Sequence, residues 1–373
     1  MRSTRFILLL IGLLVFQGKS KAQEIPHPQS MYASFDSTQN GNLFFRFEDD
    51  NFLWNNEFKS PVTKGYTLIG YHLRPTLQYY LSSNLKIQTG VNILKYTGRD
   101  GYSKISPWLS AEYMATPDLK VVFGNLNNND NHNLILPLFD QERYFTARPE
   151  EGLQFIYHHG AIKAQTWVNW EQFIFNGDPF KEEFTYGLSS DINLLSSNNF
   201  VLSWPLQLTA RHHGGEIDTS PDKMESLGNM ATGLKSKITS ADVIYELQAL
   251  FTGYKDLSHS GLRPYSSGSG LWLEASAAIH NNHFILNYWS ANKYLSPLAN
   301  SFLLSANYNK PEVLAPRRQM VLGSYRSDFK ITKGSVFSLG VNSAYDLKES
   351  QLSYTWFFNL VITRDFLLKK GLQ

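Results

Sequence analysis

The sequence predicts an all-β fold, a transmembrane antiparallel up-and-down β-barrel of about sixteen strands, with fourteen or eighteen as alternatives. Three observations support this prediction: apolar and polar side chains alternate with a period of two, short and long connections alternate along the chain, and the N-terminus carries an export signal. Aromatic residues make up 14% of the 373 residues, and the mean hydropathy is −0.29. A transmembrane barrel has this profile because only alternate residues of each strand face lipid.

The alternation is clearest in the last predicted strand, 351–366. Successive residues of a β-strand point to opposite faces of the sheet. One face carries large apolar side chains, which are Trp356, Phe358, Leu360, Ile362 and Phe366, and the other carries Ser353, Thr355 and Asn359. We therefore expect the first set to contact lipid and the second set to face the lumen.

The N-terminus has the pattern of a secretory signal peptide. Arg2 and Arg5 precede an apolar run, 6–16, which is shorter than the roughly 20 residues of a membrane-spanning helix. Ser20-Lys21-Ala22 offers a cleavage site, so we expect a signal peptide over 1–22, with an N-terminal anchor helix as the alternative. The chain then divides into an N-terminal segment (23–42), the barrel (43–366) and a polar tail (367–373). The chain contains no cysteine, which excludes a disulfide framework.

The predicted strands and their connections have a consistent parity. Strands are predicted near 43–54, 66–82, 85–97, 106–115, 119–125, 151–158, 162–173, 184–195, 199–212, 229–239, 241–253, 270–280, 283–292, 317–330, 335–346 and 351–366. Short turns alternate with long links, as periplasmic turns and extracellular loops do in bacterial barrels. The segment 301–309 also reads as a strand but would break this parity, so we place it in the long loop 293–316 as a hairpin arm above the membrane.

Together these features resemble Gram-negative outer-membrane β-barrels of the porin type. The resemblance rests on the signal peptide, the alternating strands and a final strand with the terminal aromatic residue Phe366, and it covers nearly the whole mature chain. It implies location in the outer membrane, contact with outer-membrane lipid and insertion by the barrel assembly machinery. The residues that follow Phe366 depart from the usual pattern, in which the aromatic residue is the last one.

The longest predicted loop, 126–150, is the candidate pore constriction. In sixteen-stranded porins the loop after the fifth strand folds inward, and this loop has that position and an apolar stretch, 134–139. We expect its charged residues to face cations of the barrel wall across the pore and to select solutes by charge. The loop residues are Asp140, Glu142, Arg143 and Arg148, and the wall residues are Arg46, Arg74 and Lys86. The alternative is that the apolar stretch only packs on the wall.

The sequence favours a channel for passive diffusion of small hydrophilic solutes. The alternative is a weakly conducting barrel that serves as subunit or scaffold of an outer-membrane assembly, secretion or uptake complex, with a partner bound through 293–316. A net charge of +2 gives no reason to expect nucleic acid.

No catalytic site is expected. His212 and His213 are adjacent, so they point to opposite faces of a strand. No nucleophilic residue lies at a spacing from them that is typical of a catalytic pair. The asparagine-rich segment 125–133 has oxygen ligands for calcium but few charges, which favours a solvated loop tip. The sequence therefore predicts no enzyme, no metal site and no cofactor.

Overall fold

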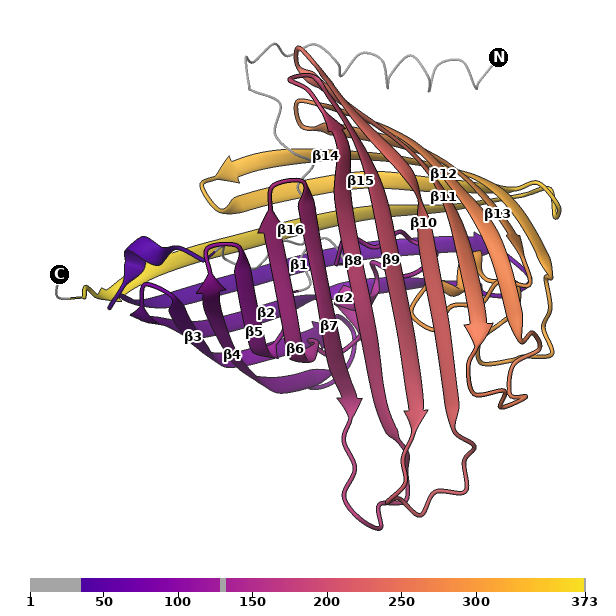
Figure 1. The fold of residues 1–373 in the computed structure, drawn as a ribbon, viewed down its shortest axis with the longest axis horizontal. Helices are drawn as coiled ribbons and strands as arrows, with labels where there is room; N and C mark the ends of the chain where they lie inside the picture. Colours follow the sequence, from indigo (N-terminus) through magenta and orange to yellow (C-terminus); the bar gives the residue numbers. More distant parts are fainter. Residues whose placement is uncertain (1–34, 128–131, 372–373) are drawn as a thin grey trace.

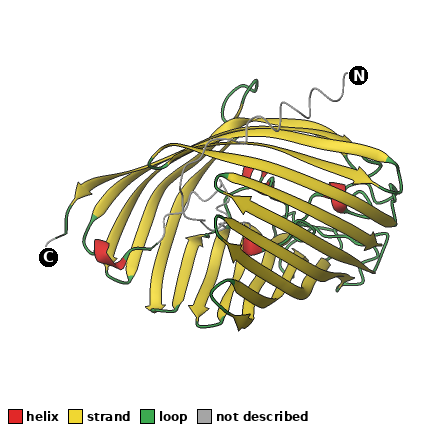
Figure 2. Cartoon of the chain, turned by 90° about the horizontal axis from the view of Figure 1, so that it is seen from above, coloured by secondary structure: helices red, strands yellow, loops and turns green. Residues whose placement is uncertain are grey.

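The structure, a computed structural model, describes residues 35–127 and 132–371 and contains a closed barrel of sixteen antiparallel strands, each paired with its neighbours in sequence order (Figures 1 and 2). The predicted fold class and strand number are confirmed. The predicted signal peptide lies outside the described residues. The strands are β1 (Leu43–Lys59), β2 (Lys64–Ser82), β3 (Leu85–Tyr96), β4 (Lys104–Thr116), β5 (Leu119–Asn125), β6 (Glu151–His159), β7 (Ile162–Gln172), β8 (Glu182–Ser196), β9 (Phe200–Gly214), β10 (Glu225–Ser240), β11 (Val243–Asp256), β12 (Ser267–Ile279), β13 (Asn282–Asn292), β14 (Arg317–Thr332), β15 (Ser335–Asp346) and β16 (Gln351–Lys369).

Short helical turns with both ends in the described residues occur at three places. They are η1 (Ser37–Gln39), α2 (Arg143–Thr146) and η3 (Ser301–Leu303). Over residues 35–127 and 132–371, no helix combines the length and the apolar character needed to span a membrane.

The barrel closes by pairing β1 with β16. The register runs from Glu57 opposite Tyr354 to Leu43 opposite Lys369. The last strand therefore continues past the predicted end at 366, because residues of the expected polar tail still find ladder partners on β1. The backbone N–H of Gly371 also donates to Asn42 Oδ1 at 2.8 Å. Closure satisfies the edge hydrogen bonds that lipid cannot satisfy.

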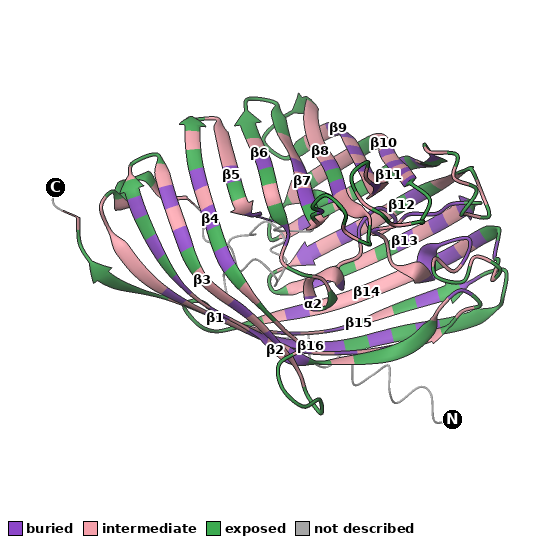
Figure 3. Ribbon diagram, turned by 90° about the horizontal axis from the view of Figure 1, so that it is seen from below, coloured by how far each residue is buried: buried purple, intermediate pink, exposed green. Residues whose placement is uncertain are grey.

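The two faces of the wall differ as the alternation predicts. Buried and exposed residues alternate along most strands (Figure 3). On β16, Trp356, Phe358 and Phe366 are exposed and point outward, Leu360 and Ile362 are partly exposed on the same face, and Asn359 is buried inside.

The wall differs in height around the barrel. β5 and β6 have 7 and 9 residues, whereas β8, β9 and β10 have 15, 15 and 16. The lengths differ by six to nine residues, which at about 3.3 Å per residue is roughly 20–30 Å along the strand. In Figure 1, β8–β10 extend beyond β5 and β6 at the long-loop end and also at the short-turn end. We call β5–β6 the low side and β8–β10 the tall side.

Two long loops fill the barrel at its outer end. An apolar cluster joins Leu134, Ile135 and Leu138 of one loop to Leu298, Phe302, Leu303 and Leu304 of the other, and to the wall residues Trp167, Trp272 and Trp289. The Trp289 indole N–H donates to the Leu303 carbonyl at 2.9 Å. The segment 301–309 is therefore not a hairpin arm above the membrane, because its apolar side chains are buried against the inner wall. A partner bound through 293–316 stays a prediction, and it cannot use these buried residues.

Candidate active site

The loop 126–150 places α2 against the inner face of β1. Phe145 of α2 is fully buried, and its ring centroid lies 4.4 Å from that of Phe52 and 5.4 Å from that of Trp54. Phe357 of β16 stacks on Trp54 at 4.4 Å. These four rings form an apolar contact between loop and wall, which fixes the position of the loop.

A buried carboxyl group provides a second attachment for the loop. Glu142 accepts hydrogen bonds from Asn56 Nδ2, at 3.0 and 3.2 Å, and from the Tyr66 hydroxyl. Burial, and after it the negative charge of Asp140, raise the pKa of the Glu142 carboxyl to about 8. Both effects outweigh the hydrogen bonds, which favour the ionised form.

Beside this contact, two titratable side chains of the wall are buried without hydrogen-bond partners in the described residues. Asp50 of β1 and His72 of β2 stand opposite each other in the register, both pointing inward, with exposed fractions of 0% and 4%. Within the described residues, both oxygens of Asp50 and both ring nitrogens of His72 lack a hydrogen bond, as does Asn359 Oδ1 on the neighbouring strand β16. Buried polar atoms are normally hydrogen-bonded, so this cluster requires another explanation.

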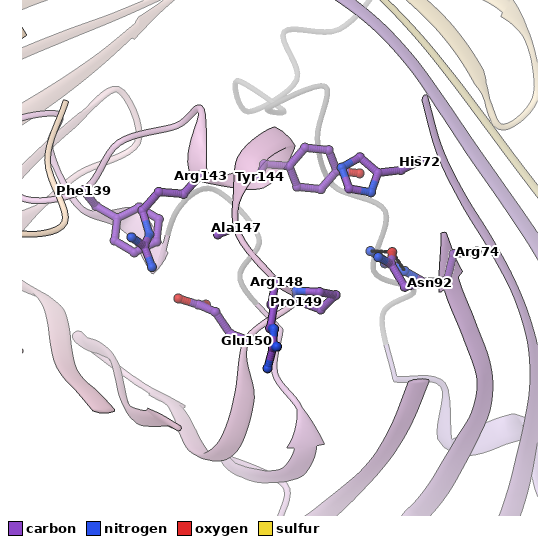
Figure 4. A pocket seen from close by; sticks show the side chains of 10 residues that line it. All are labelled: His72, Arg74, Asn92, Phe139, Arg143, Tyr144, Ala147, Arg148, Pro149 and Glu150. Atoms are coloured by element: carbon purple, nitrogen blue, oxygen red, sulfur yellow. Dashed lines mark hydrogen bonds between the residues drawn. The ribbon is translucent and has the colours of Figure 1, made fainter. Parts of the chain in front are cut away.

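A small pocket opens at His72. It has a volume of about 20 Å³, room for one water molecule, and it lies between the wall and the loop (Figure 4). The Tyr144 ring covers His72, with centroids 5.2 Å apart. Arg74 and Asn92, which hydrogen-bond at 3.3 Å, line one side, and the loop residues Arg143 and Arg148 line the other. The pocket is thus lined by the His72 imidazole, which lacks a hydrogen-bond partner in the described residues, and by the cations Arg74, Arg143 and Arg148.

The pocket region carries more positive than negative charge. Arg74 pairs with Glu48 at 3.2 Å and Arg143 pairs with Glu171 at 3.2 Å. Lys104 donates to the Thr146 carbonyl at 2.7 Å, and neither Lys104 nor the exposed Arg148 makes an ion pair within residues 35–127 and 132–371. Two cations are therefore available to an anionic ligand.

Of the wall cations that the sequence predicted to face the loop, Arg74 shares the pocket with the loop residues Arg143 and Arg148, and charge selection by these groups stays a prediction. Arg46 and Arg74 both contact Glu48, at 2.6 and 3.2 Å, and Lys86 contacts Glu112 at 2.6 Å. The wall cations are thus neutralised on the wall. Of the predicted loop residues, Asp140 is partly exposed and accepts a hydrogen bond from the Glu142 backbone N–H at 3.0 Å, while Arg143 and Arg148 line the pocket.

The predicted solvated loop tip has a different outcome. Residues 128–131 lie outside the described residues. The next residue, His132, is fully buried, with Nε2 2.6 Å from Glu150 Oε2 and its ring stacked on Trp167 at 3.7 Å. In the described parts of the chain, no three His, Cys, Asp or Glu side chains gather as metal ligands would.

Comparison with known proteins identifies the family. The sequence profile of the lipid A 3'-O-deacylase-type family matches residues 35–371. The chain belongs to this family. No curated protein matches the chain significantly.

Solved structures similar to this deacylase-type chain are outer-membrane barrels. A loop-deletion mutant of OmpT from Vibrio cholerae is 9% identical, with a TM-score of 0.52 over 87% of this chain and 99% of that one. OprD from Pseudomonas aeruginosa is 7% identical, with a TM-score of 0.51 over 90% of this chain and 98% of that one. These likenesses show the fold, and the chain is an outer-membrane β-barrel protein.

The family corrects the expectation that the protein is not an enzyme. Membership in a deacylase-type family points to a hydrolase. The sequence analysis missed Asp50 and His72 because they lie 22 positions apart and meet only through the β1–β2 register. The sequence feature that could have revealed this pair is an aspartate and a histidine on the lumen faces of two consecutive strands.

Proposed function

We propose that this protein is an outer-membrane hydrolase that removes an ester-linked acyl chain from lipid A, with its site in the pocket beneath α2. The observation that carries the proposal is the buried pair Asp50 and His72, whose side-chain polar atoms lack hydrogen-bond partners in the described residues; His72 lines the pocket and Asp50 is its register partner on β1. The family supplies the reaction class and the substrate.

The chemistry that these residues can perform is general-base hydrolysis. A water molecule in the pocket donates a proton to His72 as its oxygen attacks the ester carbonyl carbon. The carbon–oxygen bond to the sugar then breaks, and His72 returns the proton to the leaving alkoxide. Asp50, opposite His72, stabilises the imidazolium that forms between the two steps. The products are a fatty acid and a sugar hydroxyl, which balances one ester and one water.

The cations around the pocket suit a phosphorylated lipid. Lys104 and Arg148 have no acidic partner in the described residues, and Arg143 adds a third cation at the same edge. Guanidinium and ammonium groups bind phosphate through charge-assisted hydrogen bonds. We assign these three side chains to the phosphate groups of lipid A.

The low side of the wall gives a route from the outer leaflet. Arg148, Pro149 and Glu150 line the pocket and lead directly into β6, one of the two shortest strands. An outer-leaflet lipid beside β5 and β6 therefore has less wall to pass than anywhere on the tall side.

The test is lipid A analysis in cells that produce the protein. We expect mass spectrometry to detect lipid A that has lost one acyl chain, and the His72→Gln variant to reduce this product on the order of 100-fold, the usual range for a general base. His283→Gln is the matched control, since His283 is also buried in the lumen but contacts Asp328 at 3.2 Å. Heat-modifiable mobility on gels verifies folding. Undiminished deacylation by a folded His72→Gln variant would disprove the assignment.

A second candidate is the channel for small hydrophilic solutes that the sequence favoured. It rests on the barrel architecture and on the inward position of the loop 126–150. The apolar cluster that the two long loops form at the outer end opposes it, because this cluster buries the wall residues Trp167, Trp272 and Trp289. Recording in planar bilayers tests it: discrete conductance steps from the pure protein would support the channel, and their absence would remove it.

A further inference from the structure

The outward face of the tall side carries a hydrogen-bonded serine and histidine. His212 Nδ1 lies 2.8 Å from Ser226 Oγ, across the β9–β10 ladder, where the two residues are register partners. Both side chains are partly exposed. In the tautomer that carries its proton on Nε2, the imidazole accepts the hydroxyl proton at Nδ1. This is the contact that activates a serine nucleophile.

We infer from the neighbouring aromatic residues that the pair lies at the depth of the lipid ester bonds. Trp170, Phe184, His212 and Ser226 follow one another in register across β7 to β10, each within two residues of the strand end that leads to a long loop. Trp170 is 44% exposed, and its indole N–H donates to Glu182 at 3.0 Å. Outward aromatic residues with a polar edge mark the boundary between head groups and acyl chains.

We propose that Ser226 and His212 form a second hydrolytic site, which cleaves acyl esters of outer-leaflet lipids through an acyl-serine intermediate. Ser226 Oγ attacks the ester carbonyl carbon while His212 takes the hydroxyl proton. The bond to the alcohol then breaks, and His212 returns the proton to the leaving oxygen. Water, deprotonated by His212, cleaves the acyl-serine and releases the fatty acid, so one ester and one water give one acid and one alcohol.

A lysine stands where negative charge develops in this reaction. Lys255 of β11 is the register partner of Gly228, two residues from Ser226 on the same outward face. It is exposed, and its ammonium group makes no ion pair in the part of the chain that the structure describes. Diagonal neighbours in a ladder lie about 7–8 Å apart at their Cα atoms, a distance that a lysine side chain spans. The ammonium group can therefore neutralise the oxyanion of the intermediate.

The site is a dyad, and this decides which assay suits it. No carboxylate contacts His212 Nε2 among the described residues, so nothing of that kind orients the ring or stabilises its charged form. We expect slow turnover but efficient covalent capture of Ser226. The site is distinct from the pocket beneath α2, since it faces lipid on β9 and β10 and the pocket faces the lumen on β1 and β2.

Labelling with a fluorophosphonate probe tests the proposal. The full-length folded protein in outer-membrane vesicles should be labelled at Ser226, as peptide mass spectrometry would identify. Ser226→Ala should abolish the label, and His212→Gln should slow it on the order of 100-fold. Ser236→Ala is the control, because Ser236 shares the outward face of β10. Heat-modifiable mobility confirms folding of each variant.

The outcomes separate the proposal from its alternatives. Wild-type protein that folds but takes no label, or a label that persists in Ser226→Ala, would overturn it. A label lost with Ser226→Ala but unchanged in His212→Gln would also overturn it, since it would show a hydroxyl that reacts without a base. His72→Gln should leave the labelling intact.

Discussion

The neighbouring strands β16 and β1 pair along most of their lengths, yet their inward faces contact the loop 126–150 differently. On β16 the apolar residues Phe358, Leu360 and Ile362 point outward, and the inward residues are polar except for the buried Phe357 and Val361. Phe357 stacks on Trp54 of β1. On β1 the inward face carries Phe52 and Trp54, both buried. The difference arises from what lies inside, because β1 contacts the aromatic side of α2. The alternation of apolar and polar side chains therefore indicates lipid on one face of a strand and water on the other. It fails where protein replaces water in the lumen.

The largest expected effect comes from removing the ring that covers β1. Phe145→Ala deletes the contact with Phe52 and Trp54 and should weaken docking of the loop by about 3–5 kcal/mol, the usual cost of a buried Phe→Ala change. Limited proteolysis within 126–150 should become much faster while the barrel stays folded. If the loop remains equally protected, the ring contact does not hold it, and the comparison with β16 loses its explanation.

On β16 the next largest effect should follow a change on the lipid face. Leu360→Arg should cost about 2–4 kcal/mol, as a cation near the membrane midplane does. Asn342→Arg on β15 is the control, because Asn342 is inward and partly exposed. Alternation alone predicts that Asn359→Arg is tolerated, but Asn359 is 2% exposed, so we expect a cost there as well. Urea unfolding in lipid vesicles measures all three, and equal values for positions 342 and 360 would contradict the assignment of faces.

The smallest expected effect concerns pH and the attachment of the loop to β1. With the loop docked, Glu142 has a pKa of about 8, above the ordinary value of 4.5. The docked state therefore binds the proton more tightly, and its stability should be greatest below pH 4.5, decline as the pH rises toward 8, and stay low above it. Proteolysis of the loop should be faster at pH 9 than at pH 5. Glu142→Gln should remove this dependence, and a pH effect that persists in the variant would assign it to another group.

The sequence predicts the strands of the barrel wall far better than the loops that pack inside the barrel. Strands such as 119–125 and 335–346 have the predicted bounds, because a period of two and short turns are local signals. The lumen depends on contacts between distant segments. Leu138 and Leu298 belong to one apolar cluster although they lie 160 positions apart, and no local sequence pattern predicts this contact. Both candidate sites share this property, since Asp50 meets His72, and His212 meets Ser226, only through strand register.

The unequal height of the wall has a consequence for the surrounding bilayer. The seven residues of β5, tilted by about 40°, cover roughly 18 Å along the membrane normal, less than the apolar band of about 25 Å that such barrels usually present. Lipids next to a hydrophobic surface that is too short respond by thinning. Hydrophobic mismatch on the low side would thus lower the outer head groups toward Arg148 and the pocket, so the shape of the barrel itself would bring its substrate within reach.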